Sequence, residues 1–137
     1  MARRSGRVES CDAADARVRL RDAQAQLDLA TLADATSSAE ARKAAAACAV
    51  VSGIAAADAA CCAVLGERSR SQDHRDAADL IRRITAGGDQ AARHLGRLLG
   101  LKDAAQYGLN EVSGPTLIAA QRQAKALVAF AEQVVAM

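Results

Sequence analysis

The chain has 137 residues, which is long enough for one domain with a hydrophobic core. Hydrophobic residues make up 51% of it, and alanine supplies most of that share, while one Tyr and one Phe are its only aromatic residues. This composition favours closely packed helices over a sheet of bulky β-branched side chains. The net charge of +2 does not by itself indicate nucleic-acid binding, because a phosphate-binding surface needs clustered basic residues.

The first ten residues are basic, and no apolar stretch follows them within signal-peptide range. We therefore expect no secretion, a flexible tail over residues 1–10, and a single domain over residues 11–137.

A first helix is predicted from about Asp12 to Ala35. Small and apolar residues recur there at spacings of three and four, as on the buried stripe of a helix. These residues are Ala13, Ala16, Leu20, Ala23, Leu27 and Ala30.

The stretch from Ala44 to Leu65 is apolar on every side and carries one charge, Asp58. Such a helix either crosses a membrane or forms the centre of a bundle. Alanine is barely apolar enough to insert, and a central aspartate costs about 2.5–3.5 kcal/mol on insertion scales. We therefore predict a buried central helix and no membrane association. Ser37, followed by Glu40, has the spacing of a capping box, and Gly66 is placed to end the helix.

The four cysteines are Cys11, Cys48, Cys61 and Cys62. Their spacings match no zinc site and no ready disulfide pairing. We expect reduced thiols that serve as small apolar side chains in a cytoplasmic protein, with no metal and no cofactor.

The stretch from Glu67 to Gln72 is predicted to be a polar, basic loop, and Ser71 or Asp73 can cap a third helix. Gly87-Gly88 is expected to end this helix, and Asp89 to cap the next. The third helix would bury Ala77, Leu80, Ile81 and Ile84.

A fourth helix is expected to end near Tyr107-Gly108, with Lys102 on its inner stripe and His94 exposed between two arginines. Ser113 and Pro115 would open the last helix. Its predicted seam is Leu117, Ala120, Ala124, Leu127, Ala131 and Val134. No strand signal is present. The pattern predicts an all-α protein, an antiparallel four-helix bundle with a short additional helix, about five helices in all.

Three stretches resemble the HEPN superfamily of small prokaryotic helical domains. These are AVVSGIAAADAACCAVLG, QDHRDAADLI and LLGLKDAAQYGLNEVSGPTLIAAQRQAKALV. The resemblance covers most of the chain and implies a HEPN-like bundle. The family includes metal-independent ribonucleases, toxin and antitoxin partners, and catalytically silent binding modules.

Active members resemble one another in an Arg, four to six residues, His motif at the fourth helix. The His handles the 2′-hydroxyl and leaving-group protons, and the Arg stabilises charge on the phosphate. Here Lys102 stands at the Arg position, and Gln106 and Tyr107 at the His position. Glutamine cannot exchange a proton near neutral pH, and lysine cannot hold phosphate bidentately. We therefore expect no robust enzyme activity.

A second match by spacing alone joins Arg68 to His74. These two residues are the candidate catalytic pair of an alternative, toxin-type ribonuclease with a dimer cleft. Arg68 and Arg70 could also bind phosphate beside the third helix. The plainer interpretation is a helix-start histidine and solvated loop arginines.

Asp58 and Lys102 both fall on predicted inward faces, so we expect them to pair, joined by Tyr107, at a cleft. The alternative is that one of the two reaches the rim of the bundle or a dimer groove.

The sequence thus predicts a cytoplasmic HEPN-like binding or regulatory module, silent as an enzyme, that forms a homodimer. Its expected ligand is RNA, a nucleotide or a protein partner encoded nearby. The alternatives are the Arg68 and His74 ribonuclease and a purely structural interaction bundle.

Overall fold

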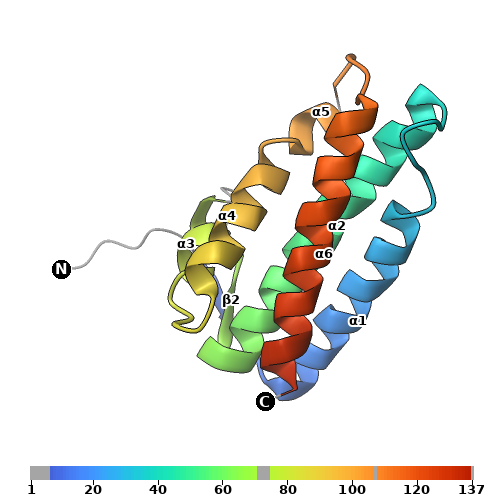
Figure 1. Cartoon of the computed structure of the whole chain (residues 1–137). Helices are drawn as coiled ribbons and strands as arrows, with labels where there is room; N and C mark the ends of the chain where they lie inside the picture. The colour runs from blue at the N-terminus through green and yellow to red at the C-terminus, as the bar shows by residue number, and fades with distance from the viewer. Residues whose placement is uncertain (1–6, 71–74, 107, 137) are drawn as a thin grey trace.

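The protein is mostly helical, with one small two-stranded sheet, as the computed structural model shows for residues 7–70, 75–106 and 108–136 (Figure 1). The all-α prediction is therefore confirmed for the bulk of this part of the chain. In chain order the elements are β1 (Val8–Ser10), α1 (Ala13–Ala30), α2 (Ala39–Leu65), β2 (Glu67–Ser69), α3 (Arg75–Ile81), α4 (Gly88–Leu99), α5 (Lys102–Gln106) and α6 (Gly114–Val135).

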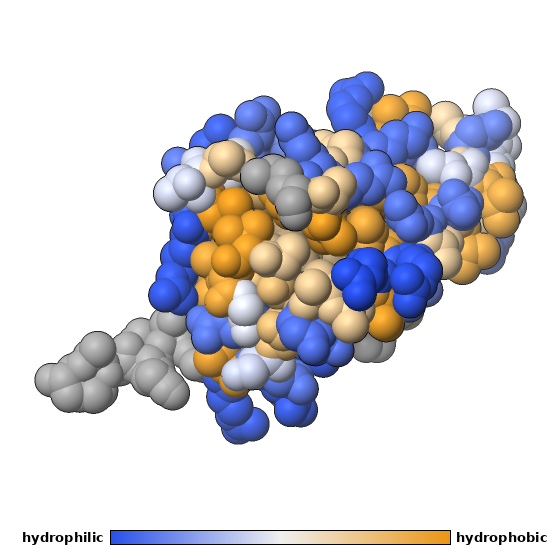
Figure 2. Space-filling model, turned by 90° about the horizontal axis from the view of Figure 1, so that it is seen from below, coloured by the Kyte–Doolittle hydropathy of each residue, from blue (hydrophilic) through white to orange (hydrophobic). Residues whose placement is uncertain are grey.

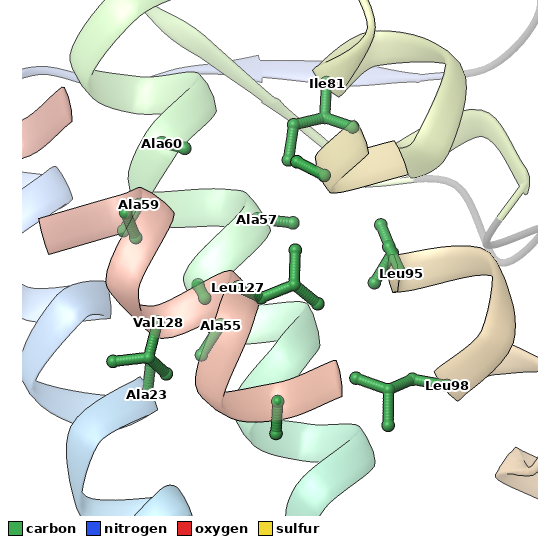
Figure 3. Close-up of a cluster of buried hydrophobic side chains, with 14 of the residues drawn as sticks. Ala23, Ala55, Ala57, Ala59, Ala60, Ile81, Leu95, Leu98, Leu127 and Val128 are labelled. Carbon is green, nitrogen blue, oxygen red and sulfur yellow. The ribbon is translucent and has the colours of Figure 1, made fainter. Parts of the chain in front are cut away.

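Helix α2 is the centre of the fold, and α1, α4 and α6 pack around it (Figure 1). It is long and apolar enough to cross a membrane by length and composition, but 61% of its most apolar window is buried inside the protein. Figure 3 shows why: alanines of α2 meet Leu127 of α6 and Leu95 and Leu98 of α4. This helix is the predicted core helix.

Close packing around α2 depends on its small residues. A Cβ atom at Gly53 would overlap the Leu98 side chain and lie 3.2 Å from Leu127. The absence of a side chain at this position lets α4 and α6 approach α2 together.

The last helix follows the predicted seam closely, because Leu117, Ala120, Ala124, Leu127, Ala131 and Val134 are all buried. Ser113 caps it by accepting a hydrogen bond from the Thr116 amide, and Pro115 stands in the first turn.

Other helix ends confirm or correct the expected caps. Gly66 ends α2 at a φ of 74°, as the pattern predicted. Asp12 opens α1 near its predicted start, with a reciprocal capping box that was not predicted, and the helix ends at Ala30 rather than at Ala35. Ser38, not Ser37, caps α2, because its hydroxyl accepts from the Ala41 amide. Ser37 instead accepts a hydrogen bond from the Asp34 amide in the preceding turn.

The predicted fourth helix is in fact two helices. Its start is capped by Gly87, at a φ of 96°, rather than by Asp89. It ends at Leu99, and Lys102 begins the separate helix α5. Ala105 of α5 packs with Ala45 and Ala46, in the amino-terminal half of α2.

The two strands were not predicted. Val8–Ser10, within the expected tail, pairs antiparallel with Glu67–Ser69, within the expected loop. Three-residue strands with mostly polar side chains carry too little alternation to be recognised from sequence. The Cys11 amide extends the pairing by donating to the Gly66 carbonyl.

Two cysteines form a disulfide, which contradicts the expectation of four reduced thiols. Cys11 and Cys62 are 51 residues apart in sequence, and their Cα atoms are 5.2 Å apart. The β1–β2 pairing brings Cys11 to the end of α2, and no cysteine spacing encodes that approach. Cys61 is a buried free thiol, as predicted, and burial raises its pKa to about 12, while Cys48 is half-buried.

Candidate functional site

Asp58 lies at the centre of a charge cluster formed by α1, α2 and the two strands. Its carboxylate is 3.1 Å from the Arg19 guanidinium and 3.3 Å from that of Arg68. Arg68 also contacts Glu9 at 3.1 Å, and Arg70 lies 3.7 Å from the same Glu9 carboxylate. The cluster borders a hollow of about 180 Å³ beside the Cys11–Cys62 disulfide.

The charges in this cluster compensate one another. The Asp58 side chain is only 12% exposed, and burial raises its pKa, although Arg19 and Arg68 oppose the rise. Because Arg68 already binds two carboxylates, a phosphate would have to displace Glu9 and Asp58 to reach it. This arrangement favours a structural role for Arg68.

The expected pair of Asp58 with Lys102 is wrong. Asp58 is paired with Arg19 and Arg68, and it lies in the carboxy-terminal half of α2. Lys102 begins α5, which packs on the other half of that helix. The prediction failed for two reasons. It treated residues 89–107 as one helix, and it assigned Arg68 to a solvated loop rather than to a strand whose side chain reaches Asp58.

The remaining predicted site residues are His74, Tyr107 and Gln106. His74 and Tyr107 lie outside the described residues, so the Arg68 and His74 pair stays a prediction. The Tyr107 link depended on the Asp58–Lys102 pair and fails with it. Gln106 ends α5.

A second candidate site is the groove between α4 and α6, which lie side by side (Figure 1). Two hollows follow it. The first, of about 390 Å³, is lined by Arg97, Leu101, Pro115, Thr116, Ala119, Ala120 and Gln123. The second, of about 260 Å³, is lined by Gly87, Gln90, Ala91, His94, Ala126, Ala129, Phe130 and Gln133.

A hydrogen bond from His94 to Gln123 joins the two helices between these hollows. His94 is therefore half-buried and held in place, rather than simply exposed as the sequence suggested. We call the two hollows and this contact the α4–α6 groove.

Three exposed arginines lie at or beside the α4–α6 groove: Arg93, Arg97 and Arg122. Arg97 lines the first hollow. Arg93 and Arg122 lie three or four residues from groove residues on the same helix, so they are neighbours on its surface. Within the described part of the chain, none of the three makes an ion pair, in contrast to Arg19, Arg42, Arg68, Arg70, Arg82 and Arg83.

Only two carboxylates belong to α4 and α6. Asp89 is in the first turn of α4. Glu132 faces α1, where it accepts a hydrogen bond from Gln24. The α4–α6 groove therefore combines a mixed lining, in which apolar side chains are the largest group, with a positive rim, and this suits an amphipathic, acidic ligand.

This groove was not predicted from the sequence. The spacing of Arg93 to Arg97 and of Arg122 to Lys125 was visible as two basic pairs on helix surfaces. Nothing in the sequence showed that these two helices lie together, so the pairs gave no common surface.

The other surface features are weaker indications of a binding site. A hollow of about 290 Å³ lies between the strands and α3, and the side chains of Asp79 and Arg83 that line it form ion pairs with Arg82 and Glu67. Figure 2 shows apolar atoms gathered in the middle of one end of the molecule and ringed by polar ones, with nothing to indicate what would cover them. Over the described residues, no group of His, Cys, Asp or Glu side chains could hold a metal ion.

Comparisons with protein-family models, with curated proteins and with solved structures gave no match.

Proposed function

We propose that this chain is a HEPN-like antiparallel four-helix bundle, built from α1, α2, α4 and α6, that binds a protein partner in the α4–α6 groove without catalysing a reaction. The observation that carries the proposal is the groove itself. It joins two hollows of about 390 and 260 Å³ to three arginines that lack ion pairs in the described residues.

The charge cluster supports the absence of ribonuclease activity. Of the two residues in the alternative catalytic pair, Arg68 is the one whose surroundings are known. Its guanidinium is held by Glu9 and Asp58. A catalytic arginine must be free to meet a phosphate that gains charge during the reaction.

The groove lining favours a protein ligand over RNA. Its lining combines Leu101, Pro115 and five alanines with Thr116 and three glutamines, and its aromatic rings are those of Phe130 and of His94, which is held by Gln123. Single-stranded RNA is typically bound by several aromatic side chains on which successive bases stack, each worth about 1–3 kcal/mol. A lining in which apolar side chains are the largest group, with a charged rim, instead resembles the grooves that accept amphipathic helices.

RNA cleavage and binding assays test this choice. We expect the purified protein to leave a single-stranded RNA intact without metal, and to show no binding at 150 mM salt that depends on the groove. Cleavage that His74→Ala abolishes would establish the ribonuclease alternative. RNA binding that Arg97→Glu weakens by tenfold or more, while Arg17→Glu on α1 does not, would make RNA the ligand of the groove.

The homodimer and the cytoplasmic location stay predictions. Within α2, Glu40, Ala44, Ala63 and Val64 are exposed, and the other residues are buried or half-buried. The Cys11–Cys62 disulfide weighs against a reducing cytoplasm, because such bonds persist mainly in oxidising compartments.

A further inference from the structure

The two hollows of the α4–α6 groove are spaced like anchor points for a helix. Ala119 lines the first and Phe130 lines the second. These residues are 11 positions apart on α6, which corresponds to about 16 Å along the helix axis. On a second helix lying along the groove, two side chains 11 positions apart would be separated by the same distance.

Two such side chains would also point the same way. Eleven residues complete three turns of an α-helix with about 20° left over, at 3.6 residues per turn. Anchors at positions i and i+11 therefore face the groove together. The volumes of about 390 and 260 Å³ accept an aliphatic side chain at each end.

The rim specifies the charge of the ligand. Arg93 and Arg97 belong to α4, and Arg122 belongs to α6. Carboxylates on the flanks of a bound helix would pair with these cations, which form no ion pairs within the described residues. Such complementarity raises association rates and excludes basic ligands.

We infer that the α4–α6 groove recognises an acidic amphipathic helix of a partner protein, with two aliphatic anchors 11 residues apart. The inference rests on the proposed function and names the chemistry of the partner.

A second copy of this chain fits less well. Helix α1 does carry two half-exposed apolar residues 11 apart, Val18 and Leu29. The exposed residues around Val18 carry mixed charges, with Arg17 and Arg21 beside Asp15 and Asp22. Helix α1 therefore lacks the uniformly acidic flanks that a positive rim would favour, and its arginines would oppose association with that rim.

A synthetic peptide tests the inference directly. The probe is an 18-residue helix, stapled on its polar face, with Leu at positions 4 and 15 and Glu along both flanks. A control peptide of the same composition carries its leucines at positions 4 and 13, nine residues apart and hence on opposite faces. We expect the matched peptide to bind at least tenfold more tightly in fluorescence anisotropy.

Protein variants locate the binding. Arg97→Glu combined with Arg122→Glu should weaken the matched peptide at least tenfold. Arg17→Glu combined with Arg21→Glu, on α1, should change its affinity less than twofold. Circular dichroism and thermal unfolding confirm that both double variants are folded.

Equal binding of the two peptides, or no effect of the rim substitutions, would overturn the inference. So would self-association of the protein alone that Arg97→Glu and Arg122→Glu abolish in sedimentation, because a second copy would then occupy the groove. If the peptide fails but a partner crosslinks to the protein through Ala119, the proposed function stands and only the helix inference falls.

Discussion

Asp58 shows how one residue can be recognised from sequence and still be given the wrong partner. Its place in an apolar helix indicated a buried carboxylate that needs a cation. The cations are Arg19 on α1 and Arg68 on β2. Both come from elements beside the carboxy-terminal half of α2, and the strand that positions Arg68 has no signal in the sequence.

The pH dependence of stability should report on Asp58. Burial raises its pKa above the usual 3.8, so the folded state holds this proton more tightly than the unfolded chain does. The stability that this proton confers is therefore complete below about pH 4 and is lost as the pH rises through the pKa of the folded state. Urea unfolding at a series of pH values should show this loss in the wild type and not in Asp58→Asn.

At pH 7 we expect Asp58→Asn to change the free energy of unfolding by no more than about 1 kcal/mol. The substitution removes a buried charge, and the two arginines left behind are 26% and 32% exposed, so water can solvate them. Asp22→Asn serves as a control, because Asp22 is a half-exposed partner of Arg19. If the pH profiles of wild type and Asp58→Asn run parallel, Asp58 is not the titrating group.

At the scale of elements, helix contacts around α2 are set by glycine and alanine. Gly53→Val should lower the free energy of unfolding by about 1–3 kcal/mol, because its side chain would overlap Leu98 and Leu127 in a packed core. Gly96→Ala on α4 is the matched control. A Cβ atom there meets no atom within 4 Å, so this change should stabilise the helix by about 0.5–1 kcal/mol.

Denaturant unfolding of both variants checks this pair of predictions. A Gly53→Val protein as stable as the wild type would show that α4 and α6 do not press on α2 at this point.

The Cys11–Cys62 disulfide ties the start of α1 to the end of α2 across 51 residues. Closing a loop of this length restricts the unfolded chain, and native disulfides of this kind contribute about 2–4 kcal/mol. We expect dithiothreitol to lower the thermal midpoint of the wild type. The midpoint of Cys11→Ala should be low already and should not respond to the reductant. A wild-type midpoint insensitive to full reduction would contradict a stabilising role for this bond.

At the scale of the whole molecule, the features predicted correctly from the sequence are those that local patterns encode. The repeated apolar positions of residues 117–134, the cap at Ser113 and the stop at Gly66 were all recognised correctly. The break between α4 and α5 was missed, because the stripe runs from Leu98 into Lys102 without interruption. The disulfide, the Asp58 cluster and the α4–α6 groove depend on contacts between distant segments, which no local pattern contains.

Photocrosslinking in the cells that produce the protein tests the central claim, that the α4–α6 groove binds a protein. The photoreactive residue p-benzoylphenylalanine replaces Ala119, an exposed residue of the groove, or Ala25, an exposed alanine on α1. We predict a protein adduct from position 119, identified by mass spectrometry, that Arg97→Glu reduces at least tenfold, and none from position 25. No adduct at position 119, or equal adducts at both positions, would contradict the account.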